Sequence, residues 1–334
     1  MIDVAMGTRL MKAAVCRRPS SLGALTITDT EVPAVPEDGV LVRVRASSAN
    51  PVDLYALTPV AYLQRGRKPT IVGTDFAGTV ESVGRRVTRY RPGDEIFGGV
   101  RGAFAEYAAV AEDGAVVRKP SGVSFQDAGT LAVAGTTALQ AVRDRGGVAT
   151  GQHVLINGAS GGVGTFAVQI AKAFGADVTA VCSTRNVELV RGLGADHVVD
   201  YMRDDFTRSV GAFDLMLDVA GNRSWSECAR LLKRGGTFVG VGAAGVQHGS
   251  GGSLRAIRHF LDVRSRSIGS GKKVVVLFIA KLNRPDLETL GELVESGRVK
   301  PVIDRRYDLT RVADALGYLD EGHSMGKVAI GIGV

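Results

Sequence analysis

Hydrophobic and polar positions follow one pattern in the first third of this 334-residue chain. From about Lys12 to Val117, short apolar runs alternate with polar residues and are separated by turns. In the run that begins at Val40, Arg43 and Arg45 interrupt the apolar residues, as in a strand with one exposed face. This part of the chain predicts a compact, mostly antiparallel β-domain.

Strands and helices begin to alternate near Ser124. Apolar residues within 125–145 have helical spacing, and a strand is expected at 153–157, followed by a helix at 162–174. Further strands are expected at 177–182, 197–200, 213–219, 237–242 and 273–279, with helices at 186–193 and up to residue 231. Six strands with intervening helices predict an α/β fold with right-handed crossovers and a doubly wound parallel sheet.

The last segment, about 280–334, is expected to return to the first domain. It combines two helices with two strand-like runs and is similar in texture to the N-terminal part. We therefore predict one domain from 1–125 and 280–334, and a second domain inserted at 126–279. MKAAV, which starts at Met11, is typical of a natural beginning, so residues 1–10 belong either to the native start or to an upstream-start extension.

A glycine-rich turn carries the strongest chemical signal. In INGASGGVGTF, Gly158, Gly161, Gly162 and Gly164 lie between an expected strand and an expected helix. Small residues there let backbone N–H groups approach a pyrophosphate at the helix N-terminus. Ala159 departs from the strict G-x-G-x-x-G spacing, but strand, turn and helix are in the order that dinucleotide binding requires. GVGAAG, at 240–245, matches that spacing literally and is followed by a loop, so it fails the same test.

Ser183, Thr184 and Arg185 follow the second strand of the expected sheet. A carboxylate at this place would bind the ribose 2′-hydroxyl of NAD(H). Hydroxyl groups and a guanidinium instead suit a 2′-phosphate, which favours NADP(H). Two alternatives stay open. Arg185 could begin a solvated helix and have no role in binding. Tyr201 could flank the adenine, the phosphate or neither.

Charge, cysteine and histidine content narrow the remaining possibilities. The net charge of +7 attracts anions, but the basic stretch 255–273 alternates with apolar residues, so we interpret it as a solvated face and not as a nucleic-acid arm. Three scattered cysteines give no disulfide framework. Five separated histidines and the absence of C-x-x-C predict no zinc site. With no apolar run of about 18 residues and no signal layout, we predict a cytoplasmic protein without a membrane span.

Many ordered segments resemble the medium-chain dehydrogenase/reductase superfamily, and within it the zinc-free quinone oxidoreductase-like branch. They run from about Met11 to the C-terminus: MKAAV, SSANPVDLY, VGTDFAGTVESVG, RPGDEIFGG, GAFAEYAAV, AGTTALQA, NGASGGVGTFAVQIAKAFGADVTAVCST and GHSMGKVAI. Zinc-dependent members have a Cys where this chain has Asn50, and a His-Glu pair where it has Thr74 and Asp75. The cysteine-rich lobe of those members would fall where only VRG stands here.

The resemblance implies a GroES-like catalytic domain, a Rossmann domain that binds NADPH, and a cleft between them. It places Asn50 and Tyr55 near the nicotinamide and the substrate, as the catalytic candidates. The implied cofactor contacts are Thr137 at the nicotinamide end, Ser160, Gly161, Gly162 and Val163 at the pyrophosphate, Ser183, Arg185 and Tyr201 at the 2′-phosphate, and Gly242, Ala243, Phe278 and Ile279 on the nicotinamide side. Simpler interpretations are that Asn50 opens a turn with the following proline and that Tyr55 packs in the β-domain.

The function expected from these observations is an NADPH-dependent, zinc-independent oxidoreductase that transfers a hydride to a quinone or an α,β-unsaturated carbonyl. Both substrates accept a hydride without a metal, because charge delocalises onto an oxygen that can be hydrogen-bonded. One alternative is an NADP-dependent aldehyde or ketone (alcohol) dehydrogenase. Another is a non-catalytic relative that binds RNA or a protein partner. The resemblance also implies a homodimer and a small-molecule substrate.

Overall fold

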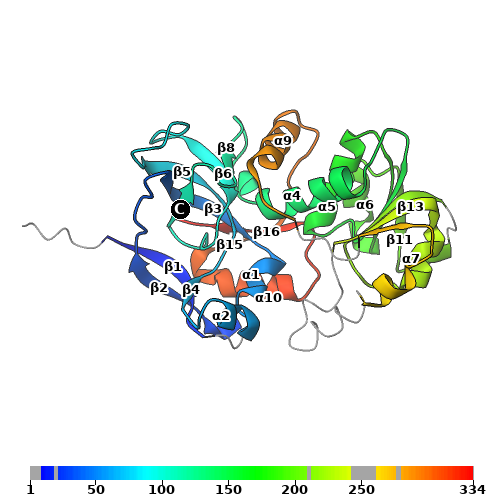
Figure 1. Ribbon diagram of the computed structural model, residues 1–334, viewed down its shortest axis with the longest axis horizontal. Coiled ribbons are helices and arrows are strands. Elements are labelled where there is room, and N and C mark those ends of the chain that lie inside the picture. Colours follow the sequence, from blue (N-terminus) through cyan, green and yellow to red (C-terminus); the bar gives the residue numbers. More distant parts are fainter. Residues whose placement is uncertain (1–8, 19–21, 209–211, 242–260, 276–279, 334) are drawn as a thin grey trace, which may run out of the picture.

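The computed structural model describes residues 9–18, 22–208, 212–241, 261–275 and 280–333. The chain forms two regions side by side, a β-rich region and a region with a parallel sheet flanked by helices (Figure 1). The two expected sheet types, one mostly antiparallel and one doubly wound and parallel, are confirmed.

The β-rich region contains two sheets. A seven-stranded sheet has the order β15-β16-β3-β5-β6-β8, with β7 also paired to β3. Its strands are β3 (Gly39–Ala49), β5 (Asp75–Val83), β6 (Glu95–Gly99), β7 (Tyr107–Ala111), β8 (Val116–Arg118), β15 (Ile303–Asp308) and β16 (Lys327–Gly331). A three-stranded sheet consists of β2 (Leu25–Glu31), β1 (Leu10–Cys16) and β4 (Thr70–Ile71). The C-terminal strand β16 pairs antiparallel with β3, so both ends of the chain contribute to one sheet.

Short helices complete this region. They are η1 (Leu22–Ala24), α1 (Pro51–Tyr55), α2 (Pro59–Gln64), η6 (Leu309–Arg311) and α10 (Val312–Asp320). In β3, Arg43 and Arg45 are exposed while Val42 and Val44 are buried, as the alternation predicted. The buried side chains of β3 pack with those of β5 and β16 in one apolar cluster. This cluster fixes the strand ends from which the polar residues described below project.

The second region is a six-stranded parallel sheet. Its order is β11-β10-β9-β12-β13-β14. The chain enters the sheet at the central strand β9 and continues outward through β10 to β11. It then crosses to the other side of β9 and adds β12, β13 and β14. The strands are β9 (His153–Asn157), β10 (Asp177–Cys182), β11 (His197–Asp200), β12 (Phe213–Asp218), β13 (Leu232–Gly240) and β14 (Lys273–Val275). Ligands bind at such a switch point, outside the carboxyl ends of the central strands.

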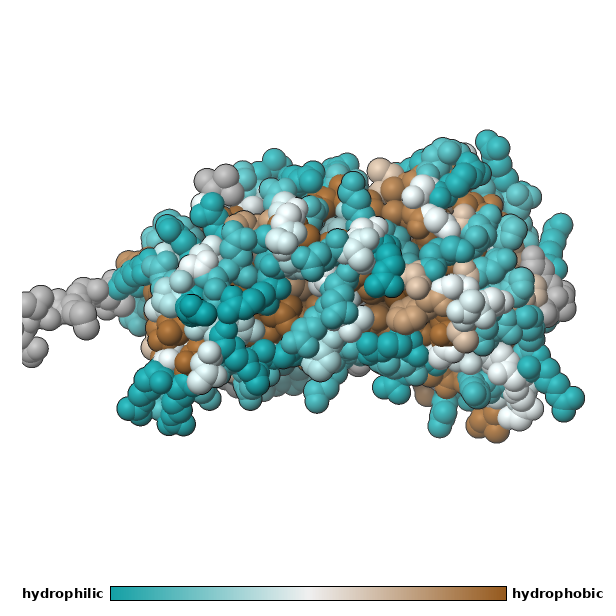
Figure 2. All heavy atoms as spheres, turned by 90° about the horizontal axis from the view of Figure 1, so that it is seen from above, coloured by the Kyte–Doolittle hydropathy of each residue, from teal (hydrophilic) through white to brown (hydrophobic). Residues whose placement is uncertain are grey.

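Helices cover this sheet and join it to the β-rich region. They are α3 (Phe125–Ala128), α4 (Ala132–Leu139), η2 (Gln140–Arg145), α5 (Gly162–Ala173), η3 (Thr184–Asn186), α6 (Val187–Gly192), η4 (Phe206–Arg208), α7 (Trp225–Leu231) and α9 (Arg284–Glu295). One large apolar cluster holds β9, α4, α5 and α9 together and also includes Ala77 and Phe97 of the β-rich region. The two regions therefore share part of their core. Figure 2 shows that the upper face is mostly hydrophilic, with hydrophobic atoms only in small patches.

Candidate functional site

The glycine-rich turn connects β9 to the N-terminus of α5. Gly158 has a φ of +86°, which favours glycine, and a Cβ at Gly164 would lie 2.1 Å from the Gly158 carbonyl oxygen. At Gly161, in contrast, an added Cβ would meet no atom closer than 3.6 Å. No side chain caps the first amides of α5. A closely packed turn with accessible backbone and an uncapped twelve-residue helix fits an anionic pyrophosphate.

The residues predicted to bind the adenosine half gather beside this turn, at the ends of β9, β10 and β11. The Asn186 side-chain amide donates to the Ser160 hydroxyl at 2.8 Å and to the Ser183 hydroxyl at 3.2 Å. Arg185 donates to the backbone carbonyl of His323 at 2.6 Å, and Tyr201 is about half exposed. The oxygen Oδ1 of Asn186 is buried and has no hydrogen-bond partner.

One carboxylate also lies at this edge, at the end of β11. Asp200 accepts the Thr184 hydroxyl at 2.6 Å and the Met202 backbone N–H at 3.0 Å, and Arg203 lies 3.5 Å away. Its oxygens are therefore already engaged within the protein. Asp200 received no role from sequence, because it stands one strand beyond the position where a ribose-binding acid is expected.

A buried polar network lies on the other side of the turn, where β3 ends and β5 and β16 begin. Asn50 donates from Nδ2 to the Ser48 carbonyl (3.0 Å) and to Asp75 Oδ2 (2.9 Å), and accepts from Lys327 Nζ at 2.5 Å. The Lys327 ammonium is 3.6 Å from the Asp75 carboxylate, and Lys327 is only 3% exposed. Burial lowers the pKa of Lys327, while Asp75 and Asp53 act in the opposite direction. Because Nδ2 of Asn50 donates to Asp75 and its Oδ1 accepts from Lys327, the amide holds both charged side chains in place.

Asp53 adds a second buried carboxyl to this network. Asp53 Oδ2 accepts the Asn50 backbone N–H at 2.8 Å, and Oδ1 accepts the Thr74 hydroxyl at 2.9 Å. Asn50 and Pro51 do begin a helix, α1, so the turn-opening interpretation holds alongside the network. The pKa of Asp53 is raised from its ordinary value of 3.8 to about 7, mainly by burial. The nearby Asp75 carboxylate acts in the same direction, and both hydrogen bonds and Lys327 act against it.

Backbone contacts join this network to the glycine-rich turn. Gly161 and Gly326 form an isolated parallel bridge, and the Gly326 N–H donates to the Ser160 carbonyl at 2.9 Å. A Cβ at Gly162 would lie 3.3 Å from Cδ of Lys327, so this side chain runs directly along the turn. The predicted pyrophosphate residues and Asn50 are therefore brought together through the segment that contains Lys327.

Thr137 is linked to the same network through α4. Its hydroxyl donates to the Val133 carbonyl at 2.6 Å, and the Val133 N–H donates to Asp75 Oδ1 at 2.7 Å. Tyr55 is 47% exposed and its hydroxyl donates to Gln64 at 3.1 Å. Tyr55 therefore leaves about half of its surface exposed, and its placement in the cofactor or substrate site stays a prediction.

Some of the predicted site residues lie outside the described part of the chain. Some residues of the polar network, in turn, were not predicted from the sequence. Gly242, Ala243, Phe278 and Ile279 fall outside the described residues, as do 255–260 of the basic stretch. Lys327, Asp75 and Asp53 belong to the network but received no role from sequence. The available signal was a charged residue in front of each apolar strand, in GKVAI and GTDFAG.

Within the described ranges, no group of three or more His, Cys, Asp or Glu side chains could hold a metal ion. The three cysteines are free and buried.

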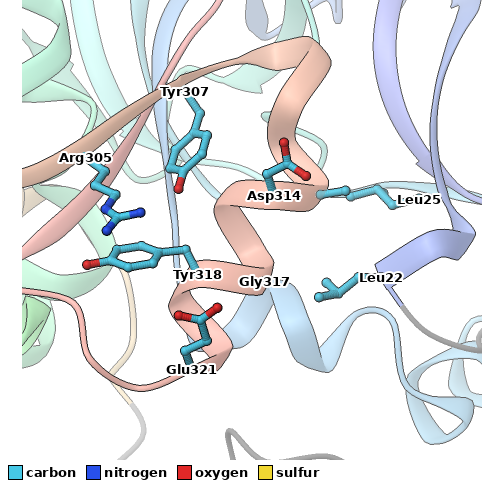
Figure 3. Close-up of a pocket in the computed structure, with 9 residues that line it drawn as sticks. Leu22, Leu25, Arg305, Tyr307, Asp314, Gly317, Tyr318 and Glu321 are labelled. Atoms are coloured by element: carbon cyan, nitrogen blue, oxygen red, sulfur yellow. The ribbon is translucent and has the colours of Figure 1, made fainter.

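A cavity of about 550 Å³ opens elsewhere, along α10 and β15. Figure 3 shows Arg305 against the Tyr318 ring there, with the guanidinium carbon 3.8 Å from the ring centre. In the part of the chain that the structure covers, no helix has the length and apolarity to cross a bilayer.

Comparison with known proteins agrees with this architecture. The family model for the alcohol dehydrogenase GroES-like domain matches residues 36–121, and the model named zinc-binding dehydrogenase matches residues 193–330. The chain is 33% identical to the human "NAD(P)H oxidoreductase RTN4IP1, mitochondrial", over 88% of this chain and 81% of the relative. It is 32% identical to the "NADPH-dependent alkenal/one oxidoreductase, chloroplastic" of Arabidopsis thaliana, over 90% and 73%.

A solved structure extends the likeness to the whole fold. The quinone oxidoreductase from Coxiella burnetii superposes with a TM-score of 0.85 at 28% identity, over 97% of this chain and 99% of that one. The expected pairing of a GroES-like β domain with a Rossmann domain is thus confirmed. On this basis the chain belongs to the medium-chain dehydrogenase/reductase superfamily, in its quinone oxidoreductase-like branch.

Proposed function

We propose that this protein is an NADPH-dependent, metal-independent reductase of quinones and α,β-unsaturated carbonyls. The observation that carries the proposal is the junction of the glycine-rich turn with the Asn50–Lys327 network, through Gly161 and Gly326. The turn that would bind phosphate is thereby adjacent to the polar network. The names of the relatives agree, since one is an NADPH-dependent alkenal/one oxidoreductase and one a quinone oxidoreductase.

The turn and its neighbours are suited to orient a nicotinamide dinucleotide. When bound, the reduced nicotinamide supplies the hydride for the reaction. The amides of Gly161 to Val163 would hold the pyrophosphate at the positive end of α5. Lys327 lies beside this turn and adds a positive charge, and Thr137 on α4 would border the nicotinamide end.

The substrate side needs a group that stabilises negative charge on an oxygen. Tyr55 has an accessible hydroxyl that can exchange its Gln64 partner for a substrate oxygen. Asn50 contributes indirectly, because its amide keeps the Lys327 ammonium in the network. In place of a metal, hydrogen-bond donors would stabilise an enolate or a hydroquinone anion. A saturated aldehyde or ketone would need stronger polarisation, so we rank carbonyl reduction second.

We propose NADPH in preference to NADH because of the residues that follow β10. Ser183 and Arg185 offer a hydroxyl and a guanidinium, and Tyr201 is accessible beside them. Arg185 would exchange the His323 carbonyl for the 2′-phosphate, which forms stronger charge-assisted hydrogen bonds. Asp200 does not oppose this, since Thr184, Met202 and Arg203 already engage it.

Steady-state kinetics with a quinone, an enone and a saturated aldehyde, each with NADPH and with NADH, test the proposal. We expect turnover of the first two substrates with NADPH.

Arg185→Ala should raise the KM for NADPH about tenfold or more, equivalent to about 1.4 kcal/mol, and change the KM for NADH little. Arg191→Ala is the matched control, because this exposed arginine of α6 pairs with Glu188 on the same helix. Equal KM values for both coenzymes in the unaltered protein would contradict the NADPH preference, and preferred turnover of the aldehyde would favour the second candidate. The homodimer and the cytoplasmic location stay predictions.

A further inference from the structure

The buried carboxyl of Asp53 has no role in the function proposed above. It lies in α1, between Asn50 and Tyr55, and the residue is only 2% exposed. Its side chain accepts a hydrogen bond from the side chain of Thr74, which lies just before β5 and is partly exposed. The Thr74 hydroxyl therefore connects an enclosed acid to the accessible side of the network.

Two hydrogen bonds determine where a proton on Asp53 can sit. Oδ2 faces the Asn50 backbone N–H, which can only donate, so Oδ2 stays an acceptor. Oδ1 faces the Thr74 hydroxyl, which can either donate or accept. A protonated Asp53 therefore donates from Oδ1 to Thr74 Oγ1, and the hydroxyl hydrogen of Thr74 then points away from Asp53. This arrangement is an ordered chain of donors that ends at Thr74.

The charged groups that face Asp53 allow both protonation states near neutral pH. They are the Asp75 carboxylate at the start of β5 and the Lys327 ammonium at the start of β16. Asp75 favours the protonated form of Asp53 and Lys327 favours the ionised form, while burial places the pKa at about 7. A general acid works best when its pKa is near the operating pH.

We propose that Asp53, acting through the Thr74 hydroxyl, supplies the proton that completes the reduction of an α,β-unsaturated carbonyl. This step rests on the proposed function. Once the β-carbon has received a hydride, the double-bond electrons reside in an enolate. The enolate α-carbon takes the Thr74 hydroxyl hydrogen, Thr74 takes the Asp53 proton, and Asp53 is left as a carboxylate. A proton from water restores Asp53 before the next turnover. A hydroquinone anion is a weaker base and depends less on this route.

Three variants test the route. Thr74→Val removes the hydroxyl at nearly constant volume, and Thr74→Ser keeps it as the matched control. Asp53→Asn keeps both hydrogen bonds, because its oxygen can accept from Asn50 and its amide can donate to Thr74, but it has no acidic proton. Each is assayed in D₂O with NADPH and an α-substituted enone. The kcat is measured against pH, and NMR reports the face of the α-carbon that receives deuterium. Infrared spectroscopy follows the protonated carboxyl directly, without turnover.

We expect the unaltered protein and Thr74→Ser to deliver deuterium to one face, with a kcat that falls above about pH 7. Thr74→Val and Asp53→Asn should lose that pH dependence, place deuterium on both faces, and lower the enone kcat at least tenfold. The loss with a quinone should be smaller. The infrared carboxyl band should titrate near pH 7 and disappear in Asp53→Asn.

Single-face delivery and an unchanged pH profile in Thr74→Val and Asp53→Asn would overturn the proton route while leaving the proposed function intact. An unaltered protein that reduces neither enone nor quinone would instead overturn the proposed function. In that case, absence of the infrared band would also show that Asp53 holds no proton.

Discussion

Replacing Asp53 with Asn should change how the stability of the protein depends on pH. The free energy of unfolding of Asp53→Asn, minus that of the unaltered protein, should be greater at alkaline pH than at acidic pH. Burial raises the pKa of this carboxyl from 3.8, its ordinary value, to about 7 in the folded chain. Between these values the folded state holds a proton that the unfolded state has released. Stability contributed at this site is therefore lost as pH rises, and the loss ends above the folded pKa.

The magnitude follows from the size of the pKa shift. Each pH unit between the two pKa values changes the free energy of unfolding by about 1.4 kcal/mol. From about pH 5 to about pH 8, the Asp53 contribution should fall by about 3 kcal/mol, since the slope vanishes above pH 7. Asn does not titrate and keeps the hydrogen-bond pattern of the protonated acid. The free-energy difference between Asp53→Asn and the unaltered protein should increase by this amount over the same interval.

Urea unfolding followed by circular dichroism at several pH values measures this difference, with the m value checked for constancy. Asp29→Asn is the matched control, because Asp29 is an exposed carboxylate of β2, and its difference should stay within about 0.5 kcal/mol. Parallel pH profiles for Asp53→Asn and the unaltered protein would refute the reasoning. They would mean that Asp53 is ionised throughout, and that the network tolerates two carboxylates beside one ammonium.

Two further substitutions examine the turn and the ion pair. Gly164→Ala should lower coenzyme affinity tenfold or more by calorimetry, because its Cβ would lie 2.1 Å from the Gly158 carbonyl oxygen. Gly192→Ala in α6, where an added Cβ meets no atom within 4 Å, should leave coenzyme affinity unchanged, and equal affinities would contradict the packing argument. Lys327→Met should cost about 3–5 kcal/mol of stability by urea unfolding, because it leaves Asp75 buried without its cation. Adding Asp75→Asn should recover part of this loss, and no recovery would show that Lys327 acts by packing alone.

The features that depend on neighbouring residues were predictable from sequence. The strand at 153–157, the glycine-rich turn and the helix from Gly162 agree with the structure to within a residue or two, because their pattern is local. The expected strands at 177–182 and 197–200 agree for the same reason. The predicted strand at 237–242 instead begins at Leu232, where Lys233, Arg234 and two glycines hide its start.

The polar network could not be predicted, because it depends on contacts between distant parts of the chain. Lys327 reads as an ordinary charged residue before a strand until β16 pairs with β3 and brings it to Asn50. The same holds for Asp53, whose pKa is set by the burial that surrounding segments impose. For Asn50, sequence indicated the correct place in the fold but not that both hydrogens of its amide would be engaged.

The pairing of β16 with β3 also bears on how the molecule assembles during synthesis. Asn50 and Lys327, which this pairing brings together, are 277 positions apart. Until β16 emerges from the ribosome, residues 46–49 at the end of β3 lack the backbone partner that β16 provides, while β7 pairs with residues 39–43 of the same strand. Closing contacts over such a sequence separation is slow compared with forming local ones. The polar network around Asn50 is consequently completed late, after the inserted parallel sheet has been synthesised.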